Sequence, residues 1–346
     1  MFDRTAESAG FDGEGSMTGS ATMARRALFR DRAGAFANVL VLVGVCAGWP
    51  GSFVLMAAPA WPLNILGVVL CTQTMTFAAY LIHEAAHQTP FAIPTANRWL
   101  GEAMGFIAGS SYASFERIRH MHVRHHRDRA DLACFDLNGL MRRRPAIRRA
   151  LQILEWAYIP AVEILMHLQV VWRPFFARSQ RSHLRRVSTM LVVRIGLLAL
   201  LGLWSLKAFL LYFVAAALLL HVLCFFDAFH HTYPQFVVEP DQPVAMDGRD
   251  VAYEQANTYS NVISGRYRWL NLLVLNFPYH NAHHERPSLP WYRLPAAHRL
   301  LATAYRRTGA SVYASYGRFF GDFLRATWRG IRNDTRLVAT TTRSAP

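Results

Sequence analysis

The sequence predicts an all-α membrane protein, in which four transmembrane helices form two hairpins and a cytoplasmic helical cap carries a histidine-rich site. Three observations predict this fold. Apolar residues make up 53% of the 346 residues and gather in long runs that are almost free of charge, and about 20 such residues suffice to cross a bilayer. The arginines lie outside these runs. Most of the 15 histidines fall in tight clusters that follow a run or lie between the two pairs of runs.

Four apolar runs are long enough to span a membrane, and they cover residues 36–56, 63–82, 190–206 and 208–229. The connections inside the two pairs, at residues 57–62 and at Lys207, are too short to hold a domain. Each pair is therefore expected to form a helical hairpin. The rest of the chain is expected on one side of the membrane.

The net charge of +15 comes almost wholly from arginine, because Lys207 is the only lysine. Arg194, one turn into the third run, is the one arginine inside a span. The positive-inside rule makes the arginine-rich side cytoplasmic, so we expect the termini and the site there, in a bacterial inner membrane. A basic chain could also bind nucleic acid, but that function predicts a basic face on a soluble fold. We expect no nucleic-acid partner.

The remaining segments are assigned by composition. We expect residues 1–35, rich in Gly, Ser and Ala, to be a disordered cytoplasmic tail that is not a cleaved signal peptide. Residues 36–328 are expected to form a single membrane domain, and residues 329–346 a second disordered tail. Within the domain we expect interfacial helices at residues 99–113 and 151–172, a long loop at 233–264 and a short apolar helix at 267–277. The four cysteines show no CxxC spacing, so they indicate neither disulfides nor a thiolate metal site.

The histidine clusters are the strongest functional signal. Residues three and four apart share one face of a helix, so each HxxHH can offer two or three imidazoles to one point. A site built from imidazole without thiolate fits redox iron chemistry or hydrolytic zinc. Because all clusters lie at one membrane face, we expect them to bind metal together. They are His83 with His87, His122 with His125 and His126, His230 with His231, and His280 with His283 and His284.

Taken together, one HxxxH and two HxxHH boxes, split by a second transmembrane hairpin, resemble the membrane fatty acid desaturase and hydroxylase superfamily. The last box and the stretch Pro290-Trp-Tyr-Arg-Leu-Pro295 are similar to the acyl-lipid desaturases and carotenoid oxygenases within it. The resemblance implies two non-haem irons held by eight or nine histidines. Carried over box by box, the iron ligands are His83, His87, His122, His125, His126, His280, His283 and His284.

A ninth ligand follows from family patterns of the kind His-Thr, which point to His231 of His231-Thr232. Asp227 stands four residues before it, so on a continued helix both side chains would point at one site. We therefore assign Asp227 the role of orienting the site without binding metal. His230 would face about 100° away, and we interpret it as a neighbouring polar residue.

The resemblance also implies a reaction, in which reduced iron activates O2 and the oxidant removes hydrogen from a lipid acyl chain. We expect a fatty acid desaturase that introduces a C=C bond. Hydroxylation, ketolation and decarboxylation to a terminal alkene stay open, because His83-Glu-Ala-Ala-His87 departs from the first box of many acyl desaturases. The chain has no iron–sulfur motif, dinucleotide fingerprint or haem module, so we expect an external electron donor such as a ferredoxin, docked on the arginine-rich face.

A rival interpretation comes from the same first box. The sequence His83-Glu84-Ala85-Ala86-His87 matches HExxH, in which two histidines bind zinc and the glutamate is the general base of a metalloprotease. That mechanism needs only one further ligand, so it leaves the other histidine clusters unexplained. A membrane zinc metalloprotease is therefore the remote alternative.

Overall fold

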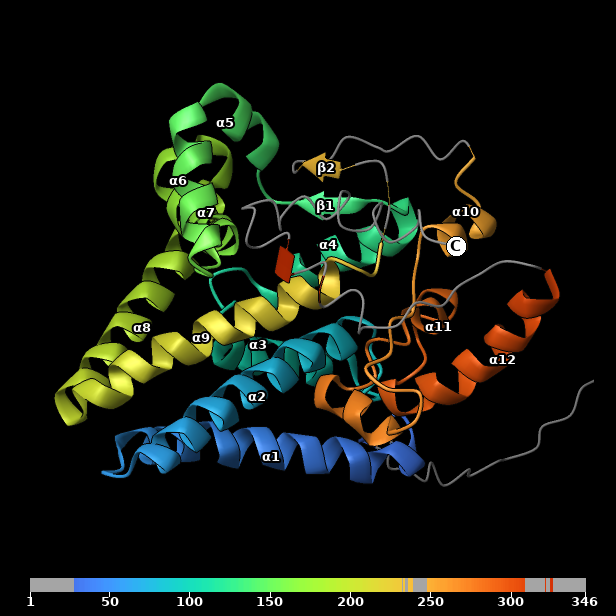
Figure 1. Cartoon of the computed structure of the whole chain (residues 1–346), viewed down its shortest axis with the longest axis horizontal. Coiled ribbons are helices and arrows are strands. Elements are labelled where there is room, and N and C mark those ends of the chain that lie inside the picture. The colour runs from blue at the N-terminus through green and yellow to red at the C-terminus, as the bar shows by residue number, and fades with distance from the viewer. Residues whose placement is uncertain are drawn as a thin grey trace, which may run out of the picture.

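The computed structural model describes residues 28–231, 233, 236–238, 248–308, 321 and 324–325, and the described chain is almost entirely helical (Figure 1). Most of the expected N-terminal tail, the whole expected C-terminal tail and Thr232 lie outside the described residues.

Four helices are long and apolar enough to cross a membrane, as the sequence predicts. They are α1 (Arg32–Ala57), α2 (Trp61–Ala86), α8 (Leu184–Trp204) and α9 (Leu206–Asp227). Pro62 lies in the first turn of α2, where its missing N–H costs no hydrogen bond. The second turn lies at Ser205 instead of Lys207, because the Ser205 hydroxyl caps α9 by accepting the Ala208 N–H at 3.2 Å.

The first two helices pack closely along their length. A side chain at Gly67 would come within 2.9 Å of the Ser52 carbonyl oxygen, so glycine is what permits this approach. The Asn64 amide lies 2.8 Å from the Ala58 carbonyl oxygen and satisfies one of the carbonyls left free at the end of α1. Lys207 donates to the same Ala58 carbonyl. The outer turns of the two hairpins are therefore in contact, and both lie at the lower left in Figure 1.

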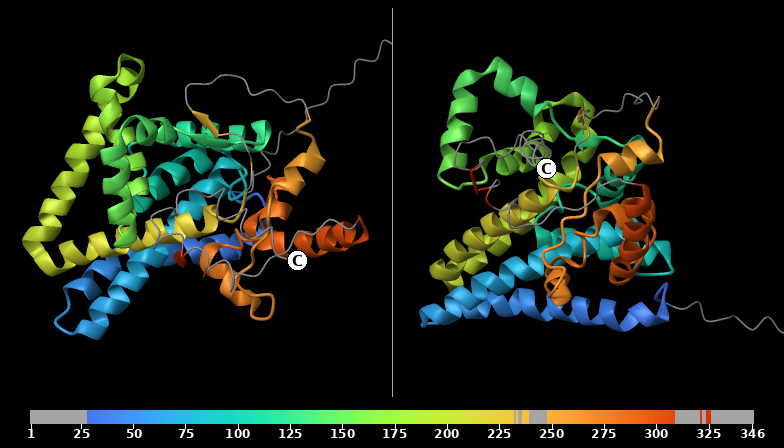
Figure 2. Two further views of the ribbon diagram at one scale, coloured as in Figure 1. Left: turned by 45° about the horizontal axis from the view of Figure 1, so that its top comes forward. Right: turned by 45° about the vertical axis from the view of Figure 1, so that its right-hand side comes forward.

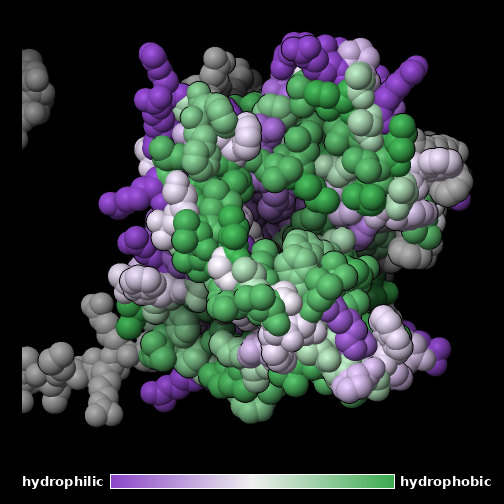
Figure 3. All heavy atoms as spheres, turned by 90° about the vertical axis from the view of Figure 1, so that its left-hand side faces the viewer, coloured by the Kyte–Doolittle hydropathy of each residue, from purple (hydrophilic) through white to green (hydrophobic). Residues whose placement is uncertain are grey.

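Helices α8 and α9 differ in how much of their surface is buried. Helix α9 packs against α1 and α2 through residues such as Ala215 and Leu219. In α8 the only buried residue is Val187, while Val192 and Leu203 are 73% and 85% exposed. The molecular face in Figure 3 is correspondingly apolar, with hydrophilic side chains along its rim and a hydrophilic hollow near its centre. An exposed apolar surface of this extent fits contact with lipid.

Between the hairpins lie α3 (Pro94–Ala108), α4 (Phe115–Asp128), β1 (Asp131–Ala133), α5 (Leu137–Arg143), α6 (Pro145–Trp156), α7 (Ala161–Phe176) and the short 3-10 helix η1 (Arg178–His183). The expected helix at residues 151–172 is wrong in one respect, since it is divided between α6 and α7. Tyr158 adopts a left-handed conformation with φ 59°, and Pro160 follows it. These two residues separate the helices, and Figure 2 shows them as distinct rods.

After α9 the described chain forms β2 (Phe236–Val238), α10 (Val251–Ala256), η2 (Arg268–Val274), α11 (His280–Glu285), η3 (Trp291–Arg293) and α12 (Leu294–Thr308). The expected loop at residues 233–264 therefore contains a strand and a helix, and β2 pairs in parallel with β1. The expected apolar helix at 267–277 is a 3-10 helix that stops where Leu275 takes φ 47°. These elements bring α11 beside the inner end of α2.

Candidate metal centre

Four segments far apart in the sequence supply the clustered histidines. His83 lies in the last turn of α2, and His87 caps that helix. Helix α4 carries the second box, and its first turn is fixed by the Ser114 hydroxyl, which accepts the Arg117 N–H at 3.3 Å. Helix α11 carries the third box in a single run of six residues. His231 lies beyond α9 and is held by a β-bridge to Thr258.

The imidazoles form two groups, each with ligand atoms within 4.8 Å of one another. We call the first the five-histidine site, made of His83, His87, His122, His126 and His283. We call the second the four-histidine site, made of His125, His231, His280 and His284. The nine histidines of these two groups are the nine that the sequence predicts as metal ligands.

Within each group the Nε2 atoms face one another at close range. In the five-histidine site, His87 and His122 are 2.6 Å apart, and His83 and His283 are 3.0 Å apart. In the four-histidine site, His231 lies 2.8 Å from His280 and 3.0 Å from His125.

Burial lowers the pKa of every imidazole that α4 and α11 contribute to these two sites. Burial lowers the pKa of His125 to about 4. Burial, followed by repulsion between neighbouring imidazolium charges, lowers the pKa values of His122 and His284 well below their usual range. The Nε2 of His284 is also buried without a hydrogen-bond partner among the described residues. Converging imidazole nitrogens fit a pair of imidazole-bound transition metals, so the residues present fit two irons.

Three of the four outer nitrogens of the four-histidine site have a partner behind the ring, while the Nδ1 of His280 is buried without one among the described residues. His125 donates through Nδ1 to the Ala130 carbonyl oxygen at 2.9 Å, and His284 lies 2.9 Å from Glu254 Oε1. The Nδ1 of His231 is 3.4 Å from the Thr258 hydroxyl. Such contacts fix the tautomer and the direction of a metal-binding imidazole. Sequence reasoning missed Glu254, because it lies in a polar segment with no motif.

The helical argument for Asp227 is wrong. Helix α9 ends at Asp227, so Asp227 and His231 do not lie one helical turn apart, and the Asp227 side chain is exposed. The chain leaves the helix because Asn261 donates to the Phe229 carbonyl at 2.6 Å and the Tyr259 N–H donates to the His230 carbonyl at 2.8 Å. His231 still reaches the four-histidine site. An orienting role for Asp227 stays a prediction.

His230 lies outside both groups. It is 1% exposed, and its ring stacks on that of His280 with centroids 4.2 Å apart and planes 15° apart. Neither of its ring nitrogens has a hydrogen-bond partner in the described chain. It packs beside the site as an aromatic ring.

Glu84 does not face the metal-sized space that a general base would need to reach. It is buried, and its Oε2 accepts the Thr89 hydroxyl at 2.5 Å and the Trp291 N–H at 3.1 Å. The carboxylate thus ties the end of α2 to η3. This arrangement argues against the metalloprotease alternative, because the HExxH glutamate must activate water at the metal.

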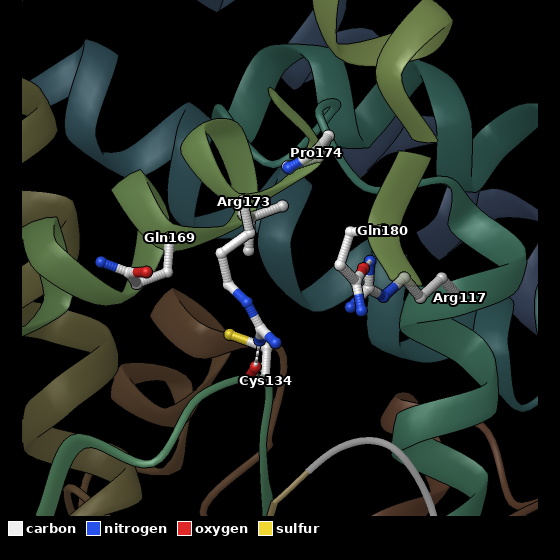
Figure 4. A pocket seen from close by; sticks show the side chains of 7 residues that line it. Arg117, Cys134, Gln169, Arg173, Pro174 and Gln180 are labelled. Atoms are coloured by element: carbon white, nitrogen blue, oxygen red, sulfur yellow. Dashed lines mark hydrogen bonds between the residues drawn. The ribbon is translucent and has the colours of Figure 1, made fainter. Parts of the chain in front are cut away.

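One further cavity lies apart from the histidines. Figure 4 shows it between α4, α7, η1 and the segment after β1, with Arg173 reaching the Cys134 carbonyl and Arg117 donating to Gln180. Its polar lining does not suit an acyl chain. None of the clustered histidines lines it, so it takes no part in the chemistry of the metal sites.

A bundle of membrane-length helices, with nine imidazoles gathered at their ends into two metal-sized groups, defines the class of histidine-box membrane oxidoreductases. The chain belongs to the fatty acid desaturase family, whose model matches residues 59–316. It is 30% identical over 267 residues to the sphingolipid delta(4)-desaturase DES1 of Rattus norvegicus, which covers 73% of this chain and 68% of the relative. The Homo sapiens protein of the same name is 29% identical over 274 residues, 74% of this chain and 71% of the relative. The protein is thus an oxidoreductase of the lipid desaturase type.

Proposed function

We propose that the protein is an O2-dependent di-iron desaturase that introduces a C=C bond into a lipid acyl chain. The convergence of nine imidazoles into a five-histidine and a four-histidine site carries this proposal. Two irons bound there would supply the electrons that reduce O2 and the oxidant that removes hydrogen from an unactivated methylene.

The chain's own residues bind and shield the metals. Imidazoles from α2, α4, α11 and the segment after α9 would hold them. Phe277 packs against His83 and His280, with ring centroids 5.0 and 4.8 Å apart. His280 and His283 are 3% and 1% exposed. Water is therefore excluded on the α11 side, while the histidines of α4 are only half-buried and leave an approach to the metals.

Two observations support a membrane lipid as the proposed substrate. The exposed apolar surfaces of α8 and α9 fit a substrate that arrives from the bilayer. Both relatives are named as sphingolipid desaturases, so membrane lipids are the first class to test. Hydroxylation, ketolation and terminal-alkene formation are other outcomes of the same hydrogen abstraction, and the product decides among them.

The electron donor is proposed to be an acidic carrier such as a ferredoxin. Helices α5 and α6 project from the body in Figure 1. They present exposed arginines at positions 142, 143, 144, 148 and 149. Opposite charges on two protein surfaces steer their encounter. We place this surface, the two metal sites and both termini on the cytoplasmic side of a bacterial inner membrane, following the arginine distribution.

The experiment is expression in a lipid-rich host under 18O2, with mass spectrometry of the lipids and iron analysis of the purified protein. A desaturase yields lipids that have lost two hydrogens and contain no 18O, whereas a hydroxylase or ketolase adds 18O. The His122→Ala variant serves as the inactive control. Active protein with stoichiometric zinc and no iron would refute the proposal.

A further inference from the structure

We propose that Glu254, held in place by Arg129, makes the His284 imidazole a more basic metal ligand. The iron of the four-histidine site would therefore differ electronically from the iron of the five-histidine site. The inference rests on the proposed function, because it takes both sites to hold iron. It assigns Glu254 and Arg129 as positioning residues, acting through His284.

The contact between Glu254 and His284 is dry and directional. The side chains are 8% and 0% exposed, and Oε1 lies 2.9 Å from Nδ1. With the proton on Nδ1, His284 donates to the carboxylate and keeps the Nε2 lone pair for metal. That Nε2 is the buried atom without a hydrogen-bond partner in the described chain. The carboxylate therefore fixes the one tautomer that can bind.

Arg129 holds the other carboxylate oxygen. Its Nε donates to Glu254 Oε2 at 2.9 Å, and the Arg129 side chain is 19% exposed. One carboxylate oxygen of Glu254 is thus held by the guanidinium while the other lies against His284 Nδ1. These two contacts fix the carboxylate group at the back of a metal-binding ring.

A reciprocal clamp sets the position of this pair. Arg129 also donates to the Arg249 carbonyl, and Arg249 donates to the Asp128 carbonyl at 2.8 Å. The two arginines therefore join the end of α4 to the segment before α10. Since α4 carries His125 and α10 carries Glu254, the clamp fixes the carboxylate relative to the four-histidine site.

The backbone at Arg129 has an unusual conformation. It ends α4 with φ 47° and ψ 51°, a left-handed conformation that glycine adopts far more readily. A glycine at this position would adopt the conformation readily, but it would have no guanidinium to bind Glu254. The structure thus places a residue disfavoured by the backbone where its side chain meets Glu254.

In the described chain, no carboxylate is hydrogen-bonded to an imidazole of the five-histidine site. The Nδ1 atoms of His126 and His283 are buried without a partner among the described residues. Glu84 Oε1 is 3.6 Å from His83 Nδ1, beyond hydrogen-bond range. A carboxylate behind an imidazole raises its basicity as a ligand. We therefore expect the four-histidine iron to be the harder of the two to reduce.

The test is Mössbauer spectroscopy of the reduced full-length protein, loaded with 57Fe and held in nanodiscs. The native protein should give two iron doublets of equal area. Glu254→Gln should keep two irons per chain and shift one doublet only. Glu254→Ala should weaken iron binding at one site by about 10–100-fold. Glu285→Gln is the matched control, because Glu285 follows His284 directly but is exposed.

Arg129→Gly is the second variant, since it relieves the left-handed backbone and removes the guanidinium without introducing bulk. It removes the contacts of Arg129 with Glu254 and with the Arg249 carbonyl, so it should melt below the native protein, and it should shift the same doublet as Glu254→Gln. Two unshifted doublets in Glu254→Gln would overturn the proposal. So would complete loss of one iron from that variant, because Glu254, whose ligand atoms lie within 4.8 Å of those of His126 and His284, would then bind metal directly. Loss of both irons or of lipid oxidation in the native protein would instead refute the proposed function.

Discussion

Substitution of Glu84 tests whether its carboxylate has a structural or a catalytic role. In a metalloprotease the glutamate of HExxH is the general base, and removing its charge abolishes turnover. Here the carboxylate accepts the Thr89 hydroxyl and the Trp291 N–H. We therefore expect Glu84→Gln and Glu84→Ala to lower stability, and to leave the activity of each folded, iron-loaded molecule largely intact.

The magnitude follows from the two contacts. The Thr89 hydroxyl has a second acceptor, the Glu84 carbonyl oxygen at 3.0 Å, so it stays satisfied when the carboxylate is lost. The Trp291 N–H is left buried without a partner in Glu84→Ala, and a lost charged hydrogen bond with an orphaned donor costs about 2–4 kcal/mol. Glu84→Gln keeps an acceptor oxygen and should cost about 1 kcal/mol.

The assay is thermal melting in nanodiscs, combined with iron content and product formation per iron. Thr89→Val is the matched control, since it removes the hydroxyl and leaves the bond to Trp291. Loss of turnover in Glu84→Gln, with unchanged melting and unchanged iron, would refute the structural role. That result would instead assign Glu84 a role in the reaction.

Three further predictions follow from the site and the topology. His231→Ala should lower the iron content from two towards one per chain, whereas His230→Ala should keep both, because only His231 belongs to a metal-sized group; equal iron loss in both variants would contradict this. The pKa of His125 falls from 6.5 to about 4 on folding, so between these values the unfolded chain binds more protons, and acidification destabilises the fold. Metal-free protein should lose about 2 kcal/mol between pH 6.5 and pH 5 from His125 alone, measurable by melting, and a pH-independent melting temperature would exclude this ionisation. A reporter fused after Lys207 should read as outside the cytoplasm and one after Arg144 as inside; the same reading at both sites would break the shared face that the histidines need.

The sequence predicted much of this arrangement for physical reasons. A span must satisfy its own backbone hydrogen bonds in lipid, so four apolar runs mark the four long helices within a few residues. The spacing of HxxxH and HxxHH places imidazoles on one helical face, and α2, α4 and α11 present them so. The spacing of the histidines within each box therefore predicted their placement on the helix correctly.

Other features depend on contacts between segments far apart in the chain. Helix α9 stops at Asp227 because Asn261 and Tyr259 bind the backbone that follows it, and no local signal marks that ending. Glu254 meets His284 across 30 residues. Such a partner has no fixed spacing, so only the folded chain reveals it.

Helix α8 buries almost none of its surface against the other described helices, and this affects how the protein is packed. Because only Val187 of that helix is buried, the hydrocarbon of the bilayer must provide most of the packing that another helix would provide elsewhere. The thickness and fluidity of the membrane then become structural parameters of the enzyme. A detergent shell that fits α8 poorly would loosen it and the adjoining α9, whose inner end leads to His231, before it disturbed the closely packed pair of α1 and α2.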